Sequence, residues 1–289
     1  MAKPGIARTL KRLANRLGVL GYSKRKNVQG LNPLIISSVL IGLTLLIASL
    51  SRKLTKSFIA DGTVRLLVFE FIATLELCAS CFELIVVADN WGVGAYAVFL
   101  FLLTIWWSRS WEDASACPYV PLEEVVEGAK SAKTALMTVG AQLVAALVTF
   151  RYVQLLWSFE MAETHLGKAY EQCTADLQVD AAVGAAIECI LTCACRLTSR
   201  VVGETHARFG NFLDAFFATA MVVLAFNFSG GYFNPALATS LKLGCAGNTF
   251  VEHLLVYWVG ACVGSLLSVL LFRSSAVQGY VDRAKSKTQ

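Results

Sequence analysis

The sequence predicts an all-α membrane protein: a six-helix bundle of two inverted repeats with two short half-helices, plus an extra N-terminal hydrophobic segment. Composition, the spacing of apolar stretches and the likeness of the two halves all predict this fold. Of 289 residues, 56% are hydrophobic and only 16% are charged, and the mean hydropathy is +0.60. Soluble domains are usually about 45–50% apolar and about 25% charged. The lipid bilayer is therefore the expected solvent.

Seven apolar stretches are long enough to cross a bilayer, since a transmembrane helix needs roughly 20 mainly apolar residues. Membrane barrel strands alternate in polarity and are far shorter, so helices are expected. The stretches are Leu31–Leu50, Val64–Val87, Trp91–Trp107, Thr134–Trp157, Val179–Leu197, Phe212–Phe228 and Phe250–Phe272.

Flanking charge orients the last six stretches. The connecting loop 158–178 is acidic, with Glu160, Glu163, Glu171 and Asp176 against Lys168. The connection 198–210 and the C-terminal end with its tail 274–289 are basic, with Arg200, Arg208, Arg273, Arg283, Lys285 and Lys287. Because Lys and Arg gather in cytoplasmic loops, the C-terminus is expected to be cytoplasmic and the acidic loop lumenal or external.

The two halves of the chain resemble each other. Glu70 precedes Cys117 by 47 residues and Glu188 precedes Asn234 by 46, and a proline follows both Cys117 and Asn234. Each half therefore has a helix with a buried glutamate, a second helix, a short segment beginning at proline and a third helix. Three helices per repeat invert the second repeat, and such repeats place their functional site at their interface near the midplane. The repeats are expected to span residues 64–157 and 179–273.

The first 50 residues lie outside these repeats. Eight Lys and Arg residues fall within the amphipathic arm 1–30. This pattern is typical of a helix lying on anionic lipid heads, although it also resembles a transit peptide. Residues 31–50 are either an additional span or a signal anchor. Basic residues on both flanks leave the direction of this segment open: Lys24, Arg25 and Lys26 before it, and Arg52, Lys53 and Lys56 after it.

The segment around Asn234 is predicted to be a half-helix inside the membrane. Asn234 is a good N-cap, and Pro235 suits the first helical position because it lacks an N–H. The segment Pro235–Gly244 is too short to cross the bilayer. Irregular backbone at membrane depth is tolerated only inside protein or beside a water-filled cavity. The alternative is a surface loop capped by Asn-Pro.

These residues carry a resemblance to a known family. Ser229–Ala236 resembles the second pore loop of the aquaporins, and Phe69–Thr74 and Tyr257–Gly260 resemble their first and last core helices. More narrowly, the chain is similar to the superaquaporins, whose first motif is degenerate. Cys117-Pro118-Tyr119 resembles the arthropod form of that motif, and Cys245 matches a cysteine that marks the subfamily.

The resemblance implies two half-helices, starting at Pro118 and Pro235 (in the tripeptide Asn234-Pro235-Ala236), that meet at mid-membrane with their positive ends together. In the family, two asparagine amides donate hydrogen bonds to the passing solute. This chain keeps Asn234 but has Cys117 at the other position, and a thiol is only a weak donor. Tyr119 replaces a small alanine and is expected against either the pore wall or a neighbouring helix.

Two further roles follow from the resemblance. Glu70 and Glu188 would accept hydrogen bonds from amides of the pore loops, with a proton relay as the alternative role. Orthodox members place an arginine three residues after the second asparagine, where this chain has Leu237. With Gly231 and Val222, Leu237 would form an apolar, uncharged selectivity filter. Such a filter would exclude protons and cations less well and guide water less strongly.

The function implied is passive conduction of water and/or small neutral solutes, such as glycerol or hydrogen peroxide, by a homotetramer in a lipid bilayer. The resemblance also implies an intracellular membrane, the endoplasmic reticulum, rather than the plasma membrane. A non-conducting membrane organiser is the alternative, motivated by Cys117, Tyr119 and Leu237. The sequence offers no cofactor motif, metal site, paired catalytic residues or nucleic-acid-reading surface, so an enzyme is not expected.

The cysteines, two further glutamates and a pair of glycines are also of interest. The nine cysteines show no disulfide framework, and Cys173, in a polar stretch, is the best candidate for an accessible thiol. Glu83 is expected near a helix end, whereas Glu76 has no assigned role. Gly260 and Gly264 form a GxxxG pattern that favours close helix contact, either between chains or within one.

Overall fold

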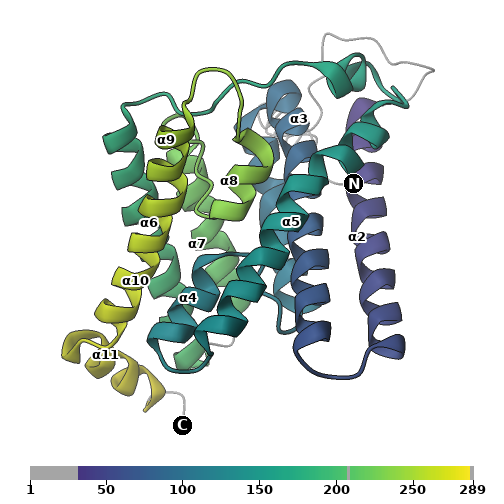
Figure 1. Ribbon diagram of the computed structural model, residues 1–289. Helices are drawn as coiled ribbons and strands as arrows, with labels where there is room; N and C mark the ends of the chain where they lie inside the picture. Colours follow the sequence, from purple (N-terminus) through teal and green to yellow (C-terminus); the bar gives the residue numbers. More distant parts are fainter. Residues whose placement is uncertain (1–31, 207–208, 287–289) are drawn as a thin grey trace, which may run out of the picture.

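The computed structural model describes residues 32–206 and 209–286, which form a bundle of long helices (Figure 1). In these residues the β-structure is a single isolated bridge between Thr174 and Ala246. The predicted arm 1–30, Leu31, Arg208 and Lys287 lie outside the described residues. The predicted all-α fold is confirmed.

The long helices match the predicted apolar stretches. Five of them, in the described part of the chain, are long and apolar enough to cross a membrane, and α7 is a shorter apolar helix. They are α2 (Pro33–Phe58), α3 (Thr63–Ser110), α5 (Ala132–Trp157), α6 (Ala181–Thr205), α7 (Gly210–Ala225) and the continuous run of α9 (Phe250–His253), the π-helical η4 (Leu254–Gly260) and α10 (Ala261–Phe272).

The helix α3 is two antiparallel helices joined at Gly92. Its backbone there has φ 83° and ψ 170°, which breaks the helix and is easily reached by glycine. The indole nitrogens of Trp106 and Trp111 donate to Glu76, which brings the end of the second half beside the middle of the first. The hairpin thus accounts for two of the predicted stretches.

The additional helix α2 packs against α3 at one edge of the bundle (Figure 1). It begins at Pro33, where the side chain of Asn32 caps the amide of Leu34, and continues to Phe58. The predicted segment 31–50 was therefore too short by about two turns. Arg52 and Lys56, interpreted as flanking charges, lie within the helix.

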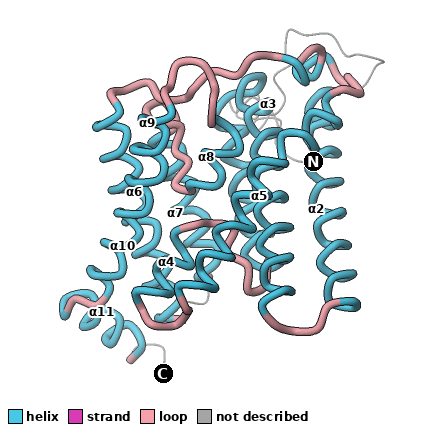
Figure 2. Tube along the Cα trace, viewed as in Figure 1, coloured by secondary structure: helices cyan, strands magenta, loops and turns pink. Residues whose placement is uncertain are grey.

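Three short helices complete the fold: α4 (Tyr119–Val126), α8 (Pro235–Lys242) and α11 (Ser275–Lys285). The loops that precede α4 and α8 run into the interior of the bundle (Figure 2). The single-turn 3₁₀-helices η2 (Glu163–His165) and η3 (Lys168–Tyr170) lie in the acidic connection, at the end of the bundle opposite α11 (Figure 1).

The GxxxG pattern brings α6 and α10 into close contact within the chain. A Cβ atom on Gly264 would lie 2.1 Å from the carbonyl oxygen of Cys189, and one on Gly260 would lie 2.7 Å from that of Ala185. Glycine is therefore required at both positions for the two helices to approach. Of the two predictions, packing within one chain is the one observed.

Candidate pore and its supporting carboxylates

The first pore loop is held by the buried carboxylate of Glu70. Its Oε1 accepts hydrogen bonds from the amide and hydroxyl of Ser115, both at 3.0 Å. Its Oε2 accepts from the amide of Ala116 and from Nε2 of Gln142, both at 2.9 Å. A carboxylate inside a membrane protein is costly unless its oxygens are satisfied. Here four donors satisfy Glu70, and they fix the loop.

Glu188 holds the second pore loop in the same way. Its Oε1 accepts from the hydroxyl of Ser229 at 2.7 Å and from the amide of Tyr232 at 3.2 Å, and its Oε2 accepts from the amide of Phe233 at 2.7 Å. In both repeats the bonded amides are the two that precede the motif. The residue just before each motif, Ala116 or Phe233, also has a positive φ. The inverted repeat thus extends to individual hydrogen bonds.

The helix α8 begins with a complete N-cap. Oδ1 of Asn234 accepts from the amides of Ala236 at 3.0 Å and Leu237 at 3.3 Å, and Pro235 occupies the first helical position. Nδ2 of Asn234 donates to the carbonyl oxygen of Ala116 at 2.8 Å. This bond joins the starts of the two half-helices across 118 residues of sequence. The second N–H of the amide remains for another acceptor.

The helix α4 begins differently. Its N-cap is Pro118, whose side chain cannot accept from the amides of the first turn. Cys117 is buried, and its backbone carbonyl accepts from the amide of Val120 at 3.2 Å. The thiol of Cys117 is a weak hydrogen-bond partner of the amide and hydroxyl of Tyr119. The ring of Tyr119 packs under the guanidinium of Arg196, 5.7 Å from it, and beside Ala261. Of the two predicted positions, Tyr119 therefore lies against neighbouring helices, α6 and α10.

A charged cluster fixes the body of α4. Glu123 is buried and accepts from Nε of Arg196 at 2.9 Å, Nη2 of Arg200 at 2.6 Å and Oγ of Ser265 at 2.5 Å. Hydrogen bonds between charged groups are about twice as strong as neutral ones. Sequence reasoning did not assign Glu123. The available signal was an acidic residue on a short intramembrane helix and two arginines four residues apart on α6.

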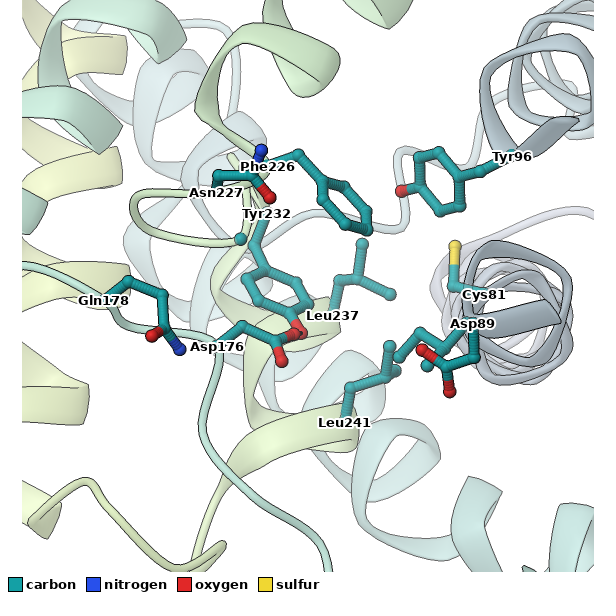
Figure 3. A pocket seen from close by; sticks show the side chains of 13 residues that line it. Cys81, Asp89, Tyr96, Asp176, Gln178, Phe226, Asn227, Tyr232, Leu237 and Leu241 are labelled. Atoms are coloured by element: carbon teal, nitrogen blue, oxygen red, sulfur yellow. Dashed lines mark hydrogen bonds between the residues drawn. The ribbon is translucent and has the colours of Figure 1, made fainter. Parts of the chain in front are cut away.

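A cavity of about 470 Å³ leads from the acidic side of the bundle to α8 (Figure 3). Two predicted filter residues, Gly231 and Leu237, line it. Tyr96 and Phe226, which sequence reasoning missed, line it too, and their rings meet edge to face with centroids 5.2 Å apart. These four residues surround an uncharged and mostly apolar stretch of the cavity wall, in which the hydroxyl of Tyr96 is the polar side-chain group.

The third predicted filter residue, Val222, packs against the core. Phe226, the C-cap of α7, lies in the cavity wall four residues later. The carbonyl oxygen of Val222 would lie 2.8 Å from a Cβ atom on Gly231, and Gly231 has a φ of 65°. A side chain at position 231 would therefore be strained. Val222 thus meets the predicted filter residue Gly231 through its backbone and not through its side chain.

The outer wall of the cavity is polar. Asp176 accepts a hydrogen bond from the hydroxyl of Tyr232 at 2.5 Å, and its Oδ1 lies 2.7 Å from Nζ of Lys242 on α8 (Figure 3). Asp89 and Gln178 also line this part. The cavity therefore changes from charged at its mouth to apolar beside α8.

A disulfide between Cys173 and Cys245 corrects the expectation that Cys173 is an accessible thiol. The acidic connection passes along the end of α8, where the amide of Ala175 donates to Ala246 O at 2.9 Å and the amide of Ala246 donates to Cys173 O at 3.0 Å. This pairing brings together two cysteines that are 72 residues apart. The bridge ties the wall of the cavity to α8.

Comparison with known proteins gives several relatives. Aquaporin-11 of Milnesium tardigradum is 29% identical over 238 residues, covering 82% of this chain and 86% of the relative. Aquaporin-12 of Mus musculus is 27% identical over 248 residues, covering 83% and 84%. The chain is an aquaporin homologue.

Solved structures agree with this assignment. The X-ray structure of the aquaglyceroporin from Plasmodium falciparum shares the fold, with a TM-score of 0.58 and 17% identity, covering 76% of this chain and 99% of that one. No family model matches the sequence. Homology to the aquaporins indicates a multi-pass membrane channel and not an enzyme.

Proposed function

We propose that this aquaporin homologue conducts water and small neutral solutes, such as glycerol and hydrogen peroxide, passively through a pore beside Asn234. The observation that carries the proposal is the hydrogen bond from Asn234 to Ala116, which sets the starts of α4 and α8 against each other. Leu237, in the first turn of α8, lines the cavity. The positive ends of two half-helices meeting there disfavour cations.

The selectivity proposed follows from the residues along the path. Leu237 stands where orthodox aquaporins have an arginine, and Tyr96 and Phe226 face it across the cavity. An uncharged, aromatic and aliphatic wall desolvates water and, apart from the hydroxyl of Tyr96, offers no side-chain group to replace its hydrogen bonds. It accepts the carbon backbone of glycerol at lower cost. Asn234 is the remaining motif amide that can orient a solute, because Cys117 is a poor donor.

The orientation proposed rests on the disulfide and on charge. Disulfides persist in oxidising compartments, so the face with Cys173–Cys245 would be lumenal or external and α11 cytoplasmic. The endoplasmic reticulum and a homotetrameric assembly are proposed on the likeness to superaquaporins.

Reconstituted vesicles test conduction. Purified protein should raise the permeability of vesicles to water, glycerol or hydrogen peroxide above that of empty vesicles in light-scattering or peroxide-dye assays. Leu237→Trp should abolish the gain by filling the cavity beside α8. Leu224→Trp is the matched control, since Leu224 lies on α7 with 60% of its surface exposed. Permeability equal to empty vesicles for all three solutes would contradict the proposal.

A non-conducting membrane organiser is the second candidate, favoured by the burial of Cys117 and Tyr119 in the first motif. The same plugged variant distinguishes the two functions. If the protein is an organiser, Leu237→Trp should rescue the phenotype of cells that lack the protein. If conduction is required, Leu237→Trp should fail to rescue it.

A further inference from the structure

A buried ion pair joins the additional helix α2 to the channel bundle. Nη1 of Arg52 lies 2.5 Å from Oε2 of Glu76, with 4% of Arg52 and 0% of Glu76 exposed. Both residues lie inside helices that are long and apolar enough to span the membrane. The carboxylates that hold the pore loops are Glu70 and Glu188, so the pore described above leaves this pair without a role.

Glu76 is surrounded by donors from two other segments. Besides Arg52 of α2, two tryptophans donate to Glu76. Nε1 of Trp106 donates to Oε1 of Glu76 at 3.1 Å, and Nε1 of Trp111 donates to Oε2 of Glu76 at 3.3 Å. Neutral indole donors cannot neutralise a carboxylate. Among the described residues that donate to Glu76, Arg52 is the one that carries a compensating positive charge.

Removing one partner of a buried pair is far more costly than replacing both, because the remaining charge is left in a medium of low dielectric constant. A cleaved or freely diffusing signal anchor would leave Glu76 in that state. The presence of Glu76 inside the bundle therefore argues that α2 stays docked.

Two further polar contacts hold α2. The hydroxyls of Thr44 and Tyr152, on α2 and α5, lie 3.0 Å apart, and Nζ of Lys56 lies 2.7 Å from Glu112 beyond the end of α3. The face of α2 toward the bundle is buried, whereas the opposite face exposes large apolar side chains: Ile35, Val39, Leu46, Leu50 and Leu54. At about 1.5 Å per residue, its 26 residues span about 39 Å, enough for the roughly 30 Å hydrocarbon layer.

We infer that α2 is a permanent seventh membrane crossing, docked on the channel by the Arg52–Glu76 pair. With this crossing, the start of α2 lies on the face of the acidic connection and the end of α11 lies on the opposite face (Figure 1). The two ends of the described chain would then face different compartments. This inference does not depend on which solute the channel conducts.

Charge variants of the full-length protein test the pair without a transport assay. Arg52→Met should lower the midpoint of thermal unfolding in detergent by roughly 10 °C. The double variant Arg52→Met, Glu76→Gln should recover most of that loss. The exposed pair of Lys56 and Glu112 provides the control. Lys56→Met should change the midpoint of unfolding by only about 1 °C. The inferred role of the pair would be overturned if the losses in unfolding midpoint from Arg52→Met and Glu76→Gln simply added. It would also be overturned if Arg52→Met and Lys56→Met lowered the midpoint equally.

Labelling with a membrane-impermeant maleimide in sealed microsomes tests the crossing even if Arg52→Met fails to fold. Asn32→Cys should label as Tyr170→Cys does, since Tyr170 lies in the acidic connection with 77% of its surface exposed. Ser286→Cys should show the opposite accessibility, and the parent chain gives the background. If Asn32→Cys and Ser286→Cys show the same accessibility to the maleimide, α2 does not cross the membrane.

Discussion

The half-helices α4 and α8 occupy equivalent places in the two repeats but are fixed by different means. Each is preceded by a loop whose last two amides donate to a buried glutamate, Glu70 for α4 and Glu188 for α8. The helix α8 adds the side-chain cap of Asn234. For α4, whose described residues include no side-chain cap, the charged cluster at Glu123 holds the helix body.

The far ends of the two helices differ as well. Lys242 near the end of α8 pairs with Asp176, and the disulfide at Cys245 ties the loop beyond it to the acidic connection. The contact between a buried glutamate and two loop amides is thus the feature that both half-helices share. The motif asparagine Asn234 adds a side-chain cap, and α4 remains in place although its N-cap residue, Pro118, provides none.

The largest effect on stability is expected from the buried glutamates that hold the loops before both half-helices. Glu70→Gln and Glu188→Gln should each reduce the free energy of unfolding by about 4 kcal/mol, because two buried backbone amides lose a charged acceptor. Denaturant titration in detergent measures the loss, and Glu204→Gln on the surface is the control. A large loss for one variant with none for the other would break the proposed equivalence.

The disulfide should stabilise the α8 side alone. Replacing Cys173 and Cys245 together by serine should cost about 3 kcal/mol, because the bridge closes a long loop. Hydrogen exchange should quicken in α8 and leave α4 unchanged. Equal acceleration in both half-helices would show that the tether acts on the whole bundle.

The charged cluster should matter to α4. Glu123→Gln leaves Arg196 and Arg200 without their shared carboxylate and should cost about 2 kcal/mol. Glu127→Gln is the matched control, since Glu127 contacts Arg200 alone and is more exposed. Equal stability of the two variants would show that the cluster does not hold the helix.

The motif residues should have the smallest effects on stability. Asn234→Ala should cost about 1 kcal/mol through loss of the cap, whereas Cys117→Ala should be nearly neutral. Cys117→Asn should raise water permeability about fivefold by adding an orienting donor worth about 1 kcal/mol. Unchanged permeability of Cys117→Asn in vesicles would show that position 117 does not face the solute path.

The sequence predicted those parts of the molecule that depend on spacing along one helix or repeat. The positions of Glu70 and Glu188 relative to their motifs were enough to predict two half-helices. Tyr96 and Phe226 were missed because each lies near a helix end, where the direction of a side chain depends on how neighbouring helices cross. The Cys173–Cys245 bridge was missed because no local pattern relates residues 72 positions apart.

Arg52 illustrates another limit of sequence reasoning. A basic residue after an apolar stretch normally marks the end of a transmembrane helix, and Arg52 was interpreted in this way. The helix α2 continues beyond Arg52 because Glu76 on α3 neutralises its charge. Only the packing of the two helices reveals this partner.

We propose that solutes pass beside the first turn of α8, and the variant Leu237→Arg tests this path. A guanidinium there should narrow the path and favour water, lowering the ratio of glycerol to water permeability in vesicles about tenfold, which corresponds to about 1.4 kcal/mol of added barrier. A ratio equal to that of the parent protein would show that Leu237 does not line the conducting path, and would contradict the account.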